Sequence, residues 1–226
     1  MSHQVLAWVL TVSCALLCGA LVACEIRGWA RGRQLSKLSA SLCFVLLPLA
    51  GNAFADRLDD HGYATLMMAG LILGAIGDAA LLAHGSTGFL IGLGSFLLGH
   101  IAYAVGFSRC LHSASVSSST MMMWAIPVGA GAIALRWLWR HLGNMRIPVI
   151  AYVSVITAMM LAAIAVFHDG ARTPTFRYLV GIGATLFFIS DLAVARDKFV
   201  APGWRNKAWG LPAYYAGQLL LAWSMI

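Results

Sequence analysis

Two aspartates stand inside long apolar segments of this sequence. Asp78 falls in the apolar run 63–83, and Asp191 falls in the run 177–195. Ionisable side chains are costly inside a membrane and by default mark a functional site there. At about 1.5 Å of rise per residue, both carboxyl groups would lie roughly 6–8 Å from the carboxyl-terminal ends of their helices. Two carboxylates that meet at one depth do not easily both stay ionised, so such a pair is typical of acid–base chemistry. The alternative is that each aspartate caps a helix or pairs with an arginine of a loop.

Other polar side chains also interrupt apolar runs. His100 is followed one turn later by Tyr103, and Gln218 is preceded by Tyr214 and Tyr215. Polar groups at such positions can form hydrogen bonds across helices. His100 and Gln218 are therefore candidates for a site, and each also admits a purely structural role.

Lys37 stands at the start of the run 38–54, where it could bind a lipid phosphate as a point charge or extend its ammonium group to the membrane surface. Ser95 and His100 are five residues apart and do not share a helix face. The sequence also has no G-x-S-x-G motif, so a serine hydrolase is disfavoured. His100 is the only histidine deep in an apolar run, so we expect no metal ion and no cofactor.

The composition predicts that these residues belong to an all-α, membrane-embedded helical bundle. The chain has 226 residues, of which 61% are hydrophobic and 10% charged, whereas soluble domains carry about 25% charged residues. A membrane span needs about 20 mainly apolar residues. Eight runs approach that length: 4–24, 38–54, 63–83, 89–107, 120–139, 147–167, 177–195 and 208–225. We therefore expect one transmembrane domain over residues 1–226 with about eight membrane-spanning helices.

The distribution of lysine and arginine predicts the orientation. The formal net charge is +7, but the basic residues lie in short connections between apolar runs, which indicates membrane topology rather than a nucleic-acid partner. The loops expected at 25–37, 84–88, 136–146 and 196–207 carry eleven Lys and Arg residues, and the other side carries four, including Arg57 within an acidic stretch. The richer side is expected in the cytoplasm. Both termini are then expected outside, in the periplasm of a bacterial inner membrane.

The two halves of the sequence resemble each other in the order of their features. The pattern G-L-x-x-aromatic-x-x-G-[H/Q]-aliphatic occurs at 92–101 and again at 210–219. Before the first copy, an isoleucine and a small residue precede Asp78, and before the second copy an isoleucine and a small residue precede Asp191. An offset of four helices would give the halves, about 1–112 and 113–226, the same topology, with a site between them. The alternative is chance similarity between glycine-rich helices.

An ordered set of segments carries a resemblance to a known family. These are GAIGDAALL at 74–82, FLLGHIAY at 96–103, GATLFFISD at 183–191 and YYAGQ at 214–218, together with Tyr152 and Met159. From about residue 37 to its end, the chain resembles the YhhN-like family of lysoplasmalogenases, which are eight-helix membrane hydrolases. The family usually shows Lys-Pro at the start of its second helix, where this chain has Lys37-Leu38.

The resemblance implies hydrolysis of the vinyl ether bond of a lysoplasmalogen, which gives a fatty aldehyde and glycerophosphoethanolamine or glycerophosphocholine. Vinyl ethers are cleaved by protonation of the β-carbon, and water captures the resulting oxocarbenium ion. A neutral carboxylic acid can give that proton, and a second carboxylate can stabilise the cation and activate water, as in glycosidases. We therefore expect Asp78 and Asp191 to form the catalytic acid/base pair, in an order that the sequence leaves open.

The substrate would be a lysophospholipid that lies among the helices, with Lys37 holding its phosphate at the basic face. The expected substrate-binding residues are Lys37, His100, Tyr103, Ser190, Tyr214, Tyr215 and Gln218. Two other classes of function fit the sequence: a small-solute or proton-coupled transporter, and a non-catalytic lysolipid-binding membrane protein. Two carboxylates at one shallow depth suit a lipid-linked bond better than a path across the bilayer.

Overall fold

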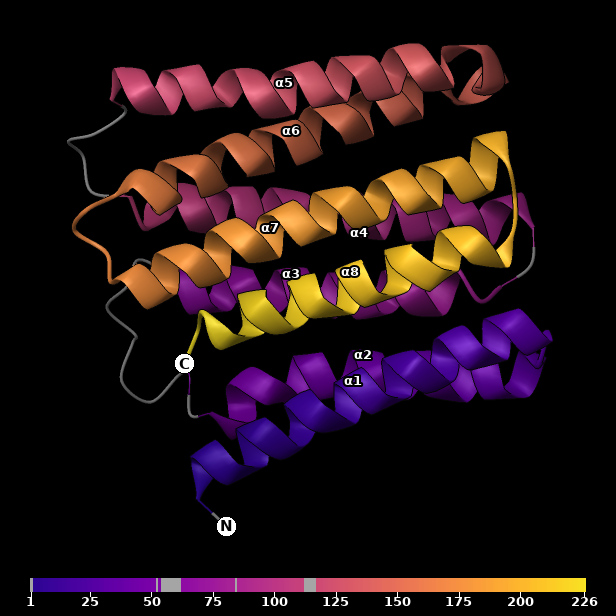
Figure 1. Ribbon diagram of the computed structural model, residues 1–226, viewed down its shortest axis with the longest axis horizontal. Coiled ribbons are helices and arrows are strands. Elements are labelled where there is room, and N and C mark those ends of the chain that lie inside the picture. The colour runs from indigo at the N-terminus through magenta and orange to yellow at the C-terminus, as the bar shows by residue number, and fades with distance from the viewer. Residues whose placement is uncertain (1, 52, 54–61, 84, 112–116) are drawn as a thin grey trace.

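Eight α-helices make up the computed structural model of the chain, which describes residues 2–51, 53, 62–83, 85–111 and 117–226. Their bounds are α1 (His3–Arg27), α2 (Ala30–Ala50), α3 (Tyr63–Ala80), α4 (Ser86–Arg109), α5 (Ser118–Leu138), α6 (Arg146–His168), α7 (Pro174–Ala195) and α8 (Trp204–Trp223). A π-helical segment, η3 (Arg196–Val200), extends α7. The helices lie side by side along one long axis (Figure 1), and no strand occurs in the described ranges. The all-α helical bundle expected from the sequence is confirmed.

Six stretches of the described chain are long and apolar enough to cross a membrane, and α2 and α8 fall outside that set. These two helices have 21 and 20 residues, but their first turns carry basic and polar side chains. Both pack against several other helices of the bundle. Polar side chains of membrane proteins face the bundle interior, so helices enclosed by others tolerate them. The multi-pass membrane architecture is confirmed, with six spans by composition instead of about eight.

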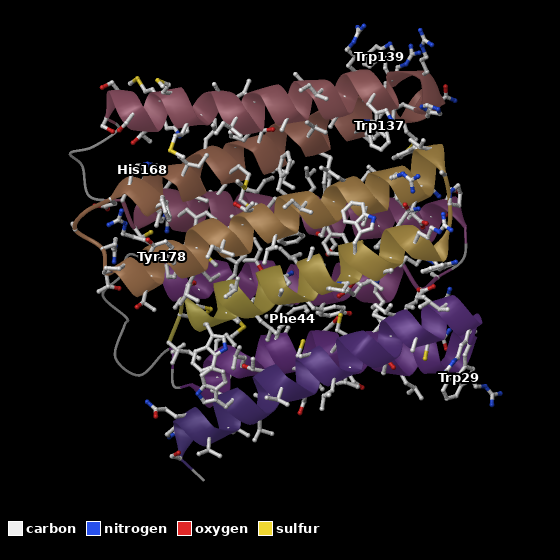
Figure 2. All side chains as sticks on the ribbon, viewed as in Figure 1. Trp29, Phe44, Trp137, Trp139, His168 and Tyr178 are labelled. Carbon is white, nitrogen blue, oxygen red and sulfur yellow. The ribbon has the colours of Figure 1, made fainter. Side chains whose placement is uncertain are left out.

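Aromatic side chains mark the two ends of the bundle (Figure 2). Trp29, Trp137 and Trp139 lie at one end and are 41–61% exposed. Tyr178 lies toward the other end and is 55% exposed. Tryptophan and tyrosine favour the membrane–water interface, so their positions fit helices that cross the bilayer from end to end.

The connection between α1 and α2 is shorter than the sequence predicts. A loop over 25–37 is wrong, because α1 continues to Arg27 and α2 begins at Ala30. Gly28 ends α1 in the left-handed conformation, with φ 68°, which glycine adopts without steric cost. The basic residues that follow are good helix formers, so α2 starts at once. Lys37 therefore lies two turns inside a helix.

The two termini lie together at the end of the bundle opposite Gly28 (Figure 1). His3 Nδ1 is 3.1 Å from the carbonyl oxygen of Ala50, and the ring centroids of Trp8 and Trp223 are 4.9 Å apart. A shared end is what an even number of spanning helices gives. The acidic stretch around Arg57 lies outside the described residues.

The helices of the two predicted halves pack in matching pairs. α3 lies along α4 as α7 lies along α8, and α6 packs on α4 as α2 packs on α8. A Cβ atom added to Gly99 would lie 3.4 Å from the carbonyl oxygen of Gly70, and one added to Gly217 would lie 2.9 Å from that of Gly183. These four glycines occupy equivalent places in the two halves. The duplication stays a prediction, which this packing supports.

A row of glycines on α3 makes room for side chains of other helices. The neighbours are the Tyr103 ring at Gly70, the Gln218 amide at Gly74 and the Phe96 ring at Gly77. A side chain at any of these three positions would overlap its neighbour. Small residues in membrane helices usually allow two backbones to approach. On α3 they admit polar and aromatic side chains behind the site described below.

Replacing Gly217 by alanine should destabilise the bundle. The new methyl group would lie 2.9 Å from the Gly183 oxygen and 3.1 Å from the Phe187 nitrogen, both in the backbone of α7. Overpacking of this kind costs about 1–3 kcal/mol, so thermal unfolding of the purified protein in detergent should have a lower midpoint. Gly94→Ala is the matched control, because a Cβ atom there meets nothing within 4 Å. Equal midpoints for the two variants would contradict this packing.

Candidate active site

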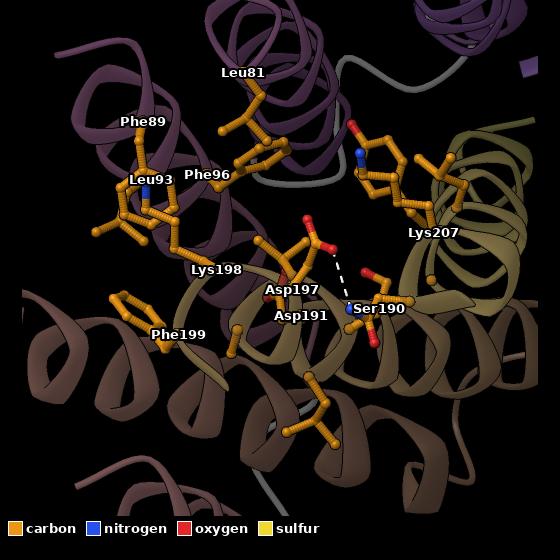
Figure 3. A pocket seen from close by; sticks show the side chains of 18 of the residues that line it. Leu81, Phe89, Leu93, Phe96, Ser190, Asp191, Asp197, Lys198, Phe199 and Lys207 are labelled. Atoms are coloured by element: carbon orange, nitrogen blue, oxygen red, sulfur yellow. Dashed lines mark hydrogen bonds between the residues drawn. The ribbon is translucent and has the colours of Figure 1, made fainter. Parts of the chain in front are cut away.

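A cavity of about 540 Å³ lies at the end of the bundle near the Gly28 turn. Asp78 from α3 and Asp191 from α7 both line it. Other predicted site residues on its wall are Lys37, Ser190 and Tyr214. Much of the remaining wall is apolar, and Figure 3 shows Phe96 and Leu93 on the same cavity as Asp191. The structure therefore brings the two aspartates to one largely apolar cavity.

Asp78 is 2% exposed, and α2 supplies two partners for its carboxylate. Lys37 Nζ lies 2.9 Å from Oδ1, and Ser41 Oγ donates a hydrogen bond to Oδ2 at 2.6 Å. Lys37 and Ser41 are one helical turn apart, so they face α3 together. Burial of a charge is tolerated when the charge is paired and hydrogen-bonded. The buried carboxyl group of Asp78 thus has both an ion-pair partner and a hydrogen-bond donor.

Lys37 has a different neighbour from the one that the sequence suggests. We expect a lipid phosphate or the membrane surface, and the structure instead places its ammonium group against Asp78, with 12% of the side chain exposed. The alternative of a membrane aspartate paired with a basic residue thus holds for Asp78, although the base comes from a helix. Tyr215 braces this part of α2, because its hydroxyl donates to the Lys37 carbonyl oxygen at 3.2 Å.

Asp191 is 15% exposed, and its partners come from α4 and α6. The Tyr152 hydroxyl donates a hydrogen bond to Oδ2 at 3.0 Å. His100 Nε2 lies 3.2 Å from the same oxygen. The two aspartates therefore differ in their surroundings: Asp78 has an ammonium and a hydroxyl group, and Asp191 has an imidazole and a phenol.

The orientation of the His100 ring limits where one proton can be. Nδ1 lies 2.6 Å from the carbonyl oxygen of Phe96, and because a carbonyl oxygen only accepts, Nδ1 carries a hydrogen. In a neutral imidazole, Nε2 then presents a lone pair. That nitrogen faces Asp191 without an aligned hydrogen bond from any described residue. Two facing lone pairs repel, so the arrangement is favourable when the pair holds one proton, on the carboxyl oxygen or on Nε2.

Some predicted site residues stand behind the cavity wall. Tyr103 donates a hydrogen bond to Gln218 Oε1 at 2.6 Å, and Gln218 Nε2 donates to the Tyr214 hydroxyl at 3.3 Å. The interhelical bond that the sequence allowed for Gln218 is therefore present. Tyr214 lines the cavity, so the chain of bonds links the wall to α4.

The two serines that the sequence singles out have ordinary structural bonds. Ser190 lines the cavity, and its hydroxyl donates to the Phe187 carbonyl oxygen at 2.7 Å. Ser95 Oγ donates to the carbonyl oxygen of Leu73 at 2.6 Å. Its hydroxyl is thus turned to the backbone of α3, which agrees with the argument against a serine hydrolase.

Ser41 and Tyr152 are the site residues that sequence reasoning missed. Ser41 follows Lys37 by four residues, and this spacing places both on one helix face. Tyr152 is among the residues that carry the family resemblance, but nothing in its local sequence indicates a partner. Its contact with Asp191 depends on how α6 is rotated against α7.

Charged side chains of both signs line the outer part of the cavity. Lys207 Nζ pairs with Glu25 Oε2 at 2.9 Å, and Arg33 lines the cavity as well. Across the cavity, Lys198 Nζ lies 4.3 Å from the centre of the Phe89 ring. A ligand with an apolar chain and a charged headgroup would find both surfaces that it needs.

Comparison with known proteins identifies the family. The model of the YhhN family matches residues 32–225. Bovine lysoplasmalogenase TMEM86A is 32% identical over 168 residues, which is 74% of this chain and 67% of that protein. A lysoplasmalogenase of Mycobacterium bovis is 31% identical over 157 residues, 67% of this chain and 56% of that protein. Human lysoplasmalogenase TMEM86B is 29% identical over 202 residues, 88% of this chain and 80% of that protein. No solved structure matches significantly. Because the family match covers nearly the whole sequence, the chain belongs to the YhhN family.

Proposed function

We propose that this chain is a lysoplasmalogenase, which hydrolyses the vinyl ether bond of a lysoplasmalogen to a fatty aldehyde and glycerophosphoethanolamine or glycerophosphocholine. One observation carries the proposal: a single cavity holds a carboxyl group paired with lysine, at Asp78, and a carboxyl group 3.2 Å from a histidine nitrogen, at Asp191. Relatives that carry the name lysoplasmalogenase support the reaction.

Asp191 acts as the proton donor in this proposal. It lies on the cavity wall, whereas His100 is 1% exposed, so the carboxyl group is the member of the pair that a ligand can reach. Transfer of its proton to the β-carbon of the vinyl ether leaves an oxocarbenium ion. The hydrogen bond from Tyr152 stabilises the carboxylate that forms. General acid catalysis of this kind contributes about 10²–10⁴-fold in rate.

Asp78 supplies the negative charge that faces the cation. Lys37 and Ser41 hold the carboxylate in the resting site. A substrate phosphate that attracts the Lys37 ammonium group would leave the charge of Asp78 less neutralised by its partner.

Water completes the reaction by adding to the oxocarbenium carbon, and its proton returns to the pair of Asp191 and His100. The hemiacetal then breaks its bond to the glycerol oxygen, which receives a proton from the same pair, and the hemiacetal hydroxyl gives its own proton back to the pair as the aldehyde forms. One water molecule is consumed, and one aldehyde and one alcohol are released.

We also propose the membrane orientation. The basic turns that follow α1, α5 and α7 lie at the cavity end of the bundle, and positive charge favours the cytoplasmic side. The site would then open toward the cytoplasmic leaflet of a bacterial inner membrane, and both termini would lie in the periplasm.

Asp78→Asn and Asp191→Asn should each lower aldehyde release from lysoplasmenylethanolamine by about 10²–10⁴-fold. An amide can neither donate the proton nor carry the charge, while it keeps the shape of the side chain. The measurement is aldehyde formation by purified protein in detergent, with the saturated ether analogue as substrate control. Thermal unfolding of each variant checks that it is folded.

Near wild-type turnover in folded Asp78→Asn and Asp191→Asn would contradict this mechanism. Wild-type protein that binds lysolipid and releases no aldehyde would instead favour a non-catalytic lipid-binding protein. Uptake of a labelled solute into liposomes, again without aldehyde, would favour a transporter.

His100→Gln should lower kcat about 10- to 100-fold and leave KM nearly unchanged, as expected for a residue that acts through Asp191. His168→Gln is a matched control, because His168 Nδ1 makes the same kind of bond, 2.9 Å to the Ile164 carbonyl oxygen, toward the other end of the bundle (Figure 2). Equal kcat values for the two variants would show that His100 has no part in proton transfer.

A further inference from the structure

One corner of the cavity already holds a cation on an aromatic face. Lys198 Nζ lies 4.3 Å from the centroid of the Phe89 ring. The ring of Phe199 meets Phe89 edge-on, with centroids 5.9 Å apart and planes at 85°. All three side chains line the cavity, and Figure 3 shows Lys198 reaching toward Phe89. A cation within about 6 Å of a ring centroid is attracted by the negative face of the ring.

The Phe89 ring is buried, whereas the Lys198 side chain over it is exposed. Phe89 is 9% exposed and belongs to the first turn of α4. Lys198 is exposed and lies on η3, a segment of five residues. A lysine carries its charge on a flexible four-carbon stem. Another cation can therefore take the place of its ammonium group while the aromatic face stays in position.

Carboxyl groups line the same cavity. Asp197 Oδ1 accepts hydrogen bonds from the Gly203 amide at 2.8 Å and from Asn206 Nδ2 at 3.1 Å, which fix the carboxylate at the rim. In Figure 3 it stands between Lys198 and Lys207. Asp191 is another of these carboxyl groups. A carboxylate and an aromatic face together favour an organic ammonium ion over a neutral group.

We propose that the face of Phe89 binds the ammonium group of a zwitterionic lysophospholipid headgroup, which displaces the ammonium group of Lys198. Choline and ethanolamine are the chemical class that this site fits, because both place a cation two carbons from a phosphate. The inference rests on the proposed function, because it takes the ligand of the cavity to be a lysophospholipid.

The test is the binding preference between lysophosphatidylcholine and lysophosphatidylglycerol of the same acyl chain, titrated into purified protein in detergent. Both have a phosphodiester, and only the first has an ammonium group. Phe89→Leu removes the aromatic face and keeps an apolar side chain, so the preference for the choline lipid should fall about three- to tenfold. Phe89→Tyr keeps the face and should keep the preference.

Lys198→Met gives a second, independent variant. The choline lipid must displace Lys198 and the glycerol lipid need not, so removing the lysine should raise the preference for choline. An unchanged preference in both Phe89→Leu and Lys198→Met would overturn the ammonium site and leave hydrolysis untouched. The expected changes in preference, together with no aldehyde release by the wild-type protein, would support the ammonium site and overturn the proposed function.

Discussion

A carboxylate inside an apolar bundle must have partners, and this requirement governs the arrangement of the helices. An isolated charge in such surroundings is strongly unfavourable. Asp78 is therefore tied to α2 through Lys37 and Ser41, and Asp191 is tied to α4 and α6 through His100 and Tyr152. The two carboxyl groups thus have different partners, so two chemically identical side chains have different surroundings within one cavity.

Small residues on α3 let polar side chains of neighbouring helices pack closely against it. Gly70 and Gly74 on α3 leave space for the Tyr103 ring and the Gln218 amide, which then bond to each other. A larger residue would push α4 and α8 away from α3. The glycine row therefore makes room for the bonds of Tyr103 and Gln218, which reach the cavity wall through Tyr214.

Sequence alone predicts the helices and the two aspartates well, because long apolar runs are distinctive and charge within them is rare. It misplaces the start of α2, since the basic stretch before Lys37 looks like a loop by hydropathy although its residues favour helix. It also misses Ser41 and Tyr152. A single polar residue in an apolar run does not reveal its neighbour, because that depends on the rotation of each helix about its axis, which only packing decides.

The order of the partners along the chain has a consequence for synthesis in the membrane. Lys37 and Ser41 precede Asp78, and His100 and Tyr152 precede Asp191. Because a chain emerges from the ribosome amino-terminus first, each carboxyl group leaves the ribosome after the groups that will neutralise or bond to it. When either aspartate enters the bilayer, the helices that carry its partners have already been made. The order of residues along the chain therefore lowers the chance of an unpaired buried charge in the nascent protein.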